Sequence, residues 1–395
     1  MSVIKDNNTE NRNTVIISVT ALENNPGAVK GEHTAFIQSA EKSDSYDSVL
    51  SDAAGCLRCG GLVAFPTETV YGLGADGLNP EASRKIYAAK GRPSDNPLIV
   101  HIADMNALDE LAYTNDKAYT LAHAFWPGPL TIILPKKDIV PKETTGGLDT
   151  VAIRMPSHPA ALSLIRQSGV YVAAPSANIS GRPSPTKAEH VIEDMNGRID
   201  YIIDGGPVGI GIESTIVDLS GEVPTILRPG FITKKMLQNM IGEVRLDPAL
   251  ENPLDSAMKG IRPKAPGMKY THYAPKGELT LVEAKRVDVV DEGVSNAVID
   301  KIRELATEKR KAGYRVGIMA PAETLKFYEG YADSVVCVGD RKEQTTVAAG
   351  LYAALREFDE KGAEYIYAES FRGEGLSYAI MNRLLKAAGQ RVIDV

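Results

Sequence analysis

Two cations lie close together in the segment Lys90-Gly-Arg-Pro-Ser-Asp-Asn-Pro97, which follows a predicted helix. The glycine lets the backbone approach phosphate oxygens, and the arginine presents a planar fork of N–H donors to them. Lys90 and Arg92 are therefore candidates to bind the phosphates of a nucleotide, although a solvated basic loop would carry the same pair. The sequence has no G-x-x-x-x-G-K-S/T motif, which excludes a P-loop.

A second polar segment, Ala173-Ala-Pro-Ser-Ala-Asn-Ile-Ser-Gly-Arg-Pro-Ser-Pro-Thr186, follows a predicted strand. Ser176 and Asn178 alternate with Ala177, so on an extended backbone their side chains point the same way. A hydroxyl and an amide in this arrangement can bind phosphate or ribose. The same composition would also suit a Ser/Pro-rich loop in which Thr186 caps the next helix.

Other predicted strands also end in polar or cationic groups. Pro66-Thr-Glu-Thr-Val-Tyr-Gly-Leu-Gly74 follows one strand, and its glycines are expected to form a turn, since a dinucleotide fingerprint needs a third glycine. The stretch 205–215 combines glycines with Glu-Ser-Thr. Ligands of open α/β sheets bind at strand ends. We therefore expect a polyphosphate cradle from four cations, Lys90, Arg92, Arg154 and Arg228.

The elements that must position these residues alternate between strands and helices, which predicts an α/β domain of about 190 residues. His101 lies in one of the predicted strands, where a histidine either packs in the core or serves the site. We expect strands at 14–19, 62–65, 97–102, 130–134, 151–154, 170–174, 201–204, 214–218 and 225–228, and helices at 48–59, 80–89, 117–125 and 160–167.

The amino-acid composition and the hydrophobic periodicity change near residue 242. Residues 243–277 are rich in Pro, Lys and Arg and have little periodicity, which is typical of a linker. A second βαβ pattern follows and predicts a small parallel, Rossmann-like sheet. We expect its strands at 279–282, 315–319, 334–338 and 365–368, and its helices at 296–312, 345–361 and 377–388.

Composition narrows the functional class. The chain has 395 residues and a net charge of −7, which disfavours broad binding to nucleic acid. No apolar run approaches the roughly 20 residues of a membrane helix, and the first residues lack a secretory signal, so a cytoplasmic protein is expected. Three cysteines argue against a disulfide framework. Cys56 and Cys59 form a C-x-x-C on a predicted helix, without further ligands at zinc-site spacing.

Lys90-x-Arg92 and Ser176-x-Asn178, together with Pro66-Thr-Glu-Thr-Val-Tyr-Gly-Leu-Gly74, closely resemble the YrdC-type threonylcarbamoyl-adenylate synthase family. Pro266-Gly-Met-Lys-Tyr-Thr-His-Tyr-Ala-Pro275 resembles the linker of its two-domain members, and Gly375-Leu-Ser-Tyr-Ala-Ile-Met-Asn-Arg-Leu384 resembles their C-terminal domain. The resemblance implies a twisted open α/β sheet and a smaller Rossmann-like domain. The expected parts are a variable segment 1–45, a catalytic domain 46–235, a linker 236–277 that covers the active site, and a C-terminal domain 278–395.

The resemblance also implies a reaction, in which L-threonine, bicarbonate or CO2, and ATP give threonylcarbamoyl-AMP and pyrophosphate. A partner transferase then modifies the adenosine next to the anticodon of tRNA. Catalytic roles would fall to Lys90 and Arg92. L-threonine would be held by Thr69, His101, Arg154, Ala174 and Ser214. ATP would be held by Lys90, Arg92, Asn96, Thr150, Ser176, Asn178, Ser184, Arg228 and Tyr270.

Mg2+ is expected to arrive on the ATP phosphates, with no protein metal cage. The tRNA would be an indirect partner, and no membrane is expected. Two other functions compete with the synthase. A pure RNA-binding module conflicts with the acidic balance. A carbamoyl transferase of hydrogenase maturation would need paired C-x-x-C zinc fingers, which this sequence lacks.

Overall fold

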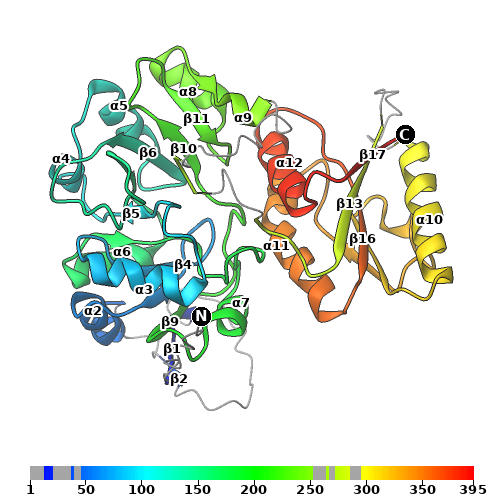
Figure 1. Ribbon diagram of the computed structural model, residues 1–395, viewed down its shortest axis with the longest axis horizontal. Coiled ribbons are helices and arrows are strands. Elements are labelled where there is room, and N and C mark those ends of the chain that lie inside the picture. Colours follow the sequence, from blue (N-terminus) through cyan, green and yellow to red (C-terminus); the bar gives the residue numbers. More distant parts are fainter. Residues whose placement is uncertain (1–12, 21–36, 40–45, 252–263, 267–271, 285–294) are drawn as a thin grey trace, which may run out of the picture.

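A computed structural model describes residues 13–20, 37–39, 46–251, 264–266, 272–284 and 295–395. Two α/β units lie side by side, each built on its own sheet (Figure 1). The α/β class and the second, smaller unit are therefore as predicted. Among the described residues, no helix is long and apolar enough to cross a membrane.

The first sheet mixes parallel and antiparallel neighbours. Its order is β12 (Arg245–Leu246), β11 (Thr225–Arg228), β10 (Thr215–Asp218), β6 (Leu130–Pro135), β7 (Thr150–Arg154), β5 (Ile99–His101), β8 (Val172–Ala173), β4 (Gly72–Asp76), β3 (Val63–Phe65), β9 (Tyr201–Asp204), β1 (Val15–Ser18) and β2 (Ile37–Ser39). Its helices are α1 (Tyr46–Val49), α2 (Ser51–Arg58), α3 (Pro80–Lys90), α4 (Ala107–Leu111), α5 (Asp116–Phe125), α6 (Pro159–Ser168), α7 (Ala188–Met195), α8 (Lys234–Ile241) and α9 (Pro248–Glu251).

Helix α3 has clear start and stop signals, and these place the first cation pair. The Asn79 side chain accepts hydrogen bonds from the backbone N–H groups of Glu81 and Ala82, and proline occupies the first helical position. Gly91 ends the helix in the left-handed conformation, at φ 60°. Lys90 is consequently the last helical residue, and Arg92 leads the chain away from the helix.

Four predictions about local structure were wrong or incomplete. The glycines after Tyr71 form strand β4 instead of a turn, because this strand crosses a crowded part of the sheet. A Cβ on Gly74 would lie 2.8 Å from both Phe65 and Val172, so side-chain packing requires glycine there. Helix α7 follows the Ser/Pro-rich segment, as one interpretation of that segment had it, but its N-cap is Lys187, not Thr186. The strand predicted at 170–174 is shorter, since β8 spans only Val172–Ala173. Residues 243–251 were expected to lack regular structure, but β12 and α9 lie there, directly after α8.

The second sheet is parallel throughout, in the order β15 (Ser334–Cys337), β14 (Val316–Ala320), β16 (Tyr365–Glu369), β13 (Glu278–Glu283) and β17 (Val392–Asp394). Figure 1 shows α10 (Asn296–Lys311) on its outer face. Helices α11 (Gln344–Glu360) and α12 (Leu376–Ala387) cover the face toward the first unit, and a short 3-10 helix spans Leu325–Phe327.

The two units share one apolar cluster. Val70 and Ile212 of the first unit are buried among the residues of α11, α12 and the second sheet. Gly211 marks the closest approach, since a Cβ there would lie 2.4 Å from the Ala348 carbonyl oxygen, and its φ is +82°. Only glycine combines that conformation with such proximity to a neighbouring helix. The second unit is therefore packed against the loop that leads into β10.

Candidate active site

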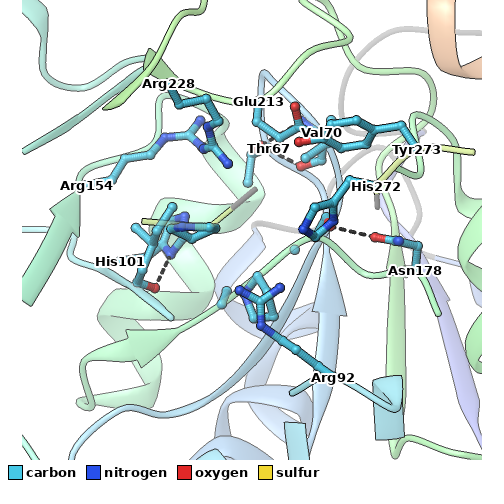
Figure 2. A pocket seen from close by; sticks show the side chains of 16 residues that line it. Thr67, Val70, Arg92, His101, Arg154, Asn178, Glu213, Arg228, His272 and Tyr273 are labelled. Atoms are coloured by element: carbon cyan, nitrogen blue, oxygen red, sulfur yellow. Dashed lines mark hydrogen bonds between the residues drawn. The ribbon is translucent and has the colours of Figure 1, made fainter. Parts of the chain in front are cut away.

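A cavity lies where several strands of the first sheet end, and three arginines line it: Arg92, Arg154 and Arg228 (Figure 2). Each side chain comes from a different part of the chain, and each residue is at most 9% exposed. Burial lowers the pKa of Arg92 to about 10 and also lowers that of Arg228, yet both stay cationic at neutral pH. Three buried guanidinium groups around one space favour a polyanionic ligand.

Each arginine is anchored by acceptors that leave part of its fork for a ligand. Arg92 donates from Nε to the Asn96 carbonyl at 3.2 Å and from Nη2 to the Pro97 carbonyl at 3.0 Å. Arg228 donates from Nε to the Ser214 carbonyl at 3.0 Å and from Nη2 to Ser214 Oγ at 3.1 Å. These bonds fix the guanidinium planes, so their direction is set before a ligand arrives.

Arg154 has a carboxylate partner. Its Nη2 lies 2.7 Å from Glu68 Oε1, and its Nε donates to the Gly128 carbonyl at 3.3 Å. Glu68 is held in turn by the backbone N–H of Ser157 at 3.1 Å. Glu68 could not be predicted as a site residue from the sequence, because its role depends on a partner 86 residues away.

His101 is the neighbour of Arg154 on the adjacent parallel strand. Its Nδ1 lies 3.1 Å from the Ile99 carbonyl, so Nδ1 carries the proton and Nε2 is left as an acceptor. Burial and then the charge of Arg154 lower its pKa to about 3. The imidazole is therefore neutral at physiological pH and can accept a hydrogen bond from an amine or hydroxyl.

Lys90 lies behind the cavity, outside its lining. Its Nζ donates to the Ser176 carbonyl at 2.5 Å and to the Asn178 carbonyl, and burial lowers its pKa well below the usual range. Ser176 and Asn178 do line the cavity, on one side as predicted, with Ser176 Oγ donating to Asn178 Oδ1 at 2.5 Å. Lys90 thus holds the backbone that presents these two side chains.

Of the other predicted residues, Ala174 lines the cavity, whereas several lie behind it. Thr69 is fully buried and bonds Thr67 at 2.9 Å. Ser184 donates to Glu213 at 2.6 Å, and Ser214 supports Arg228. Asn96 is buried and, among the described residues, its Oδ1 has no hydrogen-bond partner. Thr150 is at the opposite end of β7 from Arg154, and Tyr270 lies outside the described residues.

Four polar lining residues were not among the predicted site residues: Thr67, Glu213, His272 and Tyr273. The last two belong to the linker motif Pro266–Pro275, in which Tyr270 alone was the predicted site residue. Figure 2 shows His272 beside Asn178 and Tyr273 beside Glu213. Burial lowers the pKa of His272 to about 3, so it too is neutral. For Glu213, the only available signal was its place in the glycine-rich stretch 205–215.

The C-x-x-C pair offers no metal site. Burial raises the pKa of the Cys56 thiol to about 12, so it remains protonated, and Cys59 is exposed at the helix end. Within the described part of the chain, no three His, Cys, Asp or Glu side chains cluster closely enough to hold a metal ion.

The fold and the cavity define a two-unit α/β protein in which three buried arginines line one cavity of the first unit. Residues 55–230 match the Sua5, YciO and YrdC family model, whose description is "Telomere recombination". Residues 232–389 match the model of the threonylcarbamoyl-AMP synthase C-terminal domain. The chain belongs to the threonylcarbamoyl-AMP synthase family in its two-domain form.

Similar proteins cover nearly the whole chain. The threonylcarbamoyl-AMP synthase of Bacillus subtilis (strain 168) is 50% identical over 360 residues, which are 91% of this chain and 98% of that protein. The Pyrococcus abyssi synthase is 49% identical over 345 residues, which are 87% and 95% of the two chains. The crystal structure of P. abyssi Sua5 complexed with L-threonine has a TM-score of 0.82 and 44% identity, covering 97% of this chain and all of that one. The protein is thus an ATP-using enzyme that makes threonylcarbamoyl-AMP for tRNA modification.

Proposed function

We propose that L-threonine, bicarbonate and MgATP meet in the cavity of the three arginines and leave it as threonylcarbamoyl-AMP and pyrophosphate. The observation that carries this proposal is the convergence of Arg92, Arg154 and Arg228 on one space beside a neutral histidine. A polyphosphate needs the cations, and an amino acid needs both a cation for its carboxylate and a neutral acceptor for its amine.

On the threonine side, Arg154 pairs with the carboxylate and His101 Nε2 accepts from the amine or the hydroxyl. Ala174 contributes its backbone at the surface of the cavity. Thr69 supports this side from behind, through Thr67. Ser214, which was expected on this side, holds Arg228 of the nucleotide side. The shared feature of these groups is that they orient threonine through its carboxylate and its neutral amine or hydroxyl.

On the nucleotide side, Arg92 and Arg228 bind the phosphates, while Ser176 and Asn178 bind phosphate or ribose. Lys90 acts chiefly by holding the Ser176–Asn178 loop, to which it makes two backbone hydrogen bonds. Asn96 and Ser184 support this side, through Arg92 and Glu213. Thr150 and Tyr270 keep their predicted contacts with ATP as expectations.

The chemistry requires three steps. Bicarbonate first loses hydroxide to give CO2. The neutral amine of threonine then attacks the CO2 carbon, a new N–C bond forms, and the amine proton passes to the released hydroxide, which leaves a carbamate and one water molecule. A carbamate oxygen then attacks the α-phosphorus of ATP, a new P–O bond forms, and the bond to the β-phosphate breaks to release pyrophosphate. The arginines neutralise charge on the phosphoryl group in flight, and alignment of three substrates supplies much of the acceleration.

Mg2+ belongs to the substrate MgATP in this proposal. Glu213, the carboxylate in the cavity lining, already accepts hydrogen bonds from Ser184, Tyr352 and Arg383, so it is not a free metal ligand. In nucleotide-dependent enzymes, Mg2+ is usually bound by phosphate oxygens of the substrate together with one or two carboxylates. The product is a labile mixed anhydride, which we propose passes to a threonylcarbamoyl transferase acting on tRNA in the cytoplasm, where ATP, threonine and tRNA are available.

The test is pyrophosphate release from MgATP, with threonine and bicarbonate omitted in turn. Release that needs both substrates, and is reduced by at least about 100-fold in Lys90→Ala, supports the synthase. The exposed Arg84→Ala is the matched control for removing a cation and should keep the wild-type rate. Release without threonine would contradict the proposal, as would RNA retention with no release at all.

A further inference from the structure

Each inner helix of the second unit sends one fully buried arginine into the first unit. Arg356 of α11 pairs with Asp194 at 2.7 Å, and Arg383 of α12 reaches the loop before β10. Both residues are 1% exposed. Desolvating a guanidinium is costly unless all its donors find acceptors. A buried arginine that crosses between two units therefore has a geometric task, and the task of Arg383 concerns the cavity.

Arg383 holds two segments of the first unit, one next to Arg228 and one next to Ser214, the hydrogen-bond partner of Arg228. Its Nε donates to Glu213 Oε2 at 3.2 Å, its Nη2 donates to the Glu213 carbonyl at 3.3 Å, and its Nη1 donates to the Pro229 carbonyl. Glu213 immediately precedes Ser214, and Pro229 immediately follows Arg228. Because Arg228 is itself bonded to Ser214, one side chain from α12 brackets the whole Arg228–Ser214 pair.

The contact between Arg383 and Glu213 also decides which arginine pairs with the Glu213 carboxylate. Glu213 is buried and ionised, its pKa lowered to about 2 by Arg383, Arg228 and the Ser184 hydrogen bond despite its desolvation. Tyr352 of α11 adds a hydrogen bond at 3.0 Å. A buried carboxylate takes the nearest cation available. With Arg383 in place, Glu213 has a direct ion pair that leaves Arg228 directed toward Ser214 and the cavity.

We propose that Arg383 is a positioning residue of the active site, through which the C-terminal unit fixes Arg228 for the phosphates of ATP. The inference rests on the proposed function only in assigning Arg228 to ATP. It gives the second unit a part in nucleotide affinity, carried by three donors of one side chain. Threonine, whose proposed ligands Arg154 and His101 make no contact with Arg383, depends on it far less.

Arg383→Lys tests the proposal, because lysine keeps the charge but cannot bridge three acceptors as a fork. From pyrophosphate release, we expect the KM for ATP to rise roughly 10- to 100-fold, as for loss of hydrogen bonds to a charged group. The KM for threonine should stay within about 2-fold on the same grounds, since its proposed ligands are untouched. Arg383→Gln is the second variant, and the melting temperature of each is recorded.

Coupling to Arg228 separates positioning from general damage. In an Arg228→Ala background, Arg383→Lys should raise the KM for ATP no further, since the group that it positions is gone. Arg341→Lys is the matched control: Arg341 pairs with the buried Glu369 at 2.6 Å inside the second unit, and its loss should leave both KM values unchanged.

Three results would overturn the inference. These are an unchanged KM for ATP in folded Arg383 variants, an equal rise in both KM values, and full additivity with Arg228→Ala. None of them touches the proposed function, which stands or falls on whether the wild-type enzyme needs threonine and bicarbonate to release pyrophosphate.

Discussion

Arg154 and Arg228 face the same cavity but are held in different ways. Arg154 takes its partners, Glu68 and the Gly128 carbonyl, from the first unit alone. Arg228 is bonded to Ser214, and that pair is bracketed by Arg383 from the second unit. The proposed threonine side is thus held within one unit, whereas the proposed nucleotide side is completed across an interface. Binding of the larger substrate is the step that the second unit can influence.

The largest effect should come from removing Arg154. Arg154→Ala takes away the cation proposed for the threonine carboxylate and leaves the half-buried Glu68 carboxylate without its ion-pair partner. We expect the KM for threonine to rise about 100-fold, in the range for losing one member of a buried charge pair. The KM for ATP should change by less than about 3-fold, because Arg228 has separate anchors.

Arg154→Ala combined with Glu68→Gln isolates the effect of the unpaired carboxylate. If the double variant regained wild-type threonine affinity, the role of Arg154 would be to neutralise Glu68 and not to bind substrate. An equal loss of affinity for both substrates would erase the distinction between the two sides of the cavity.

The sequence carried enough information to find the cations and not enough to find what holds them. Arg92, Arg154 and Arg228 could be predicted because each follows a helix or ends a strand, and such ends are where open α/β sheets bind ligands. Glu213 and Arg383 lie 170 residues apart, on elements whose own periodicity carries no trace of the other. Strand β4 was missed for a related reason. Its glycine Gly74 is required by close packing against Phe65 and Val172, which are distant in sequence, and not by a turn.

A smaller effect is expected where the units touch. Gly211→Ala would put a methyl group against the Ala348 carbonyl and force an alanine into a left-handed conformation. We expect a loss of about 2 kcal/mol in the free energy of unfolding. Since Glu213 is two residues away, the KM for ATP should rise about 10-fold, as for one displaced charged hydrogen bond.

Gly209→Ala is the control for Gly211→Ala, because Gly209 is exposed and a methyl group added there would meet no atom within 4 Å. Denaturant unfolding and pyrophosphate release would be compared for both variants. Equal behaviour of the two would mean that close packing at Gly211 does not matter to the nucleotide side.

The smallest effect concerns acid stability on the threonine side. His101 has a pKa of about 3 when folded, against about 6.5 when unfolded, so the unfolded chain binds more protons between these values. The free energy of unfolding must therefore fall as the pH drops below about 6.5. Between pH 7.5 and 5.5 this single group accounts for about 1.4 kcal/mol of the loss. His101→Asn should be less stable than wild type at pH 7.5, but its free energy of unfolding should fall correspondingly less on acidification, as measured by urea unfolding at both pH values.

The control is the exposed His123→Asn, whose free energy of unfolding should fall as much as that of wild type. An unchanged loss in His101→Asn would mean that the imidazole takes up its proton without unfolding, which would place a second charge beside Arg154 and end its proposed role as a neutral acceptor.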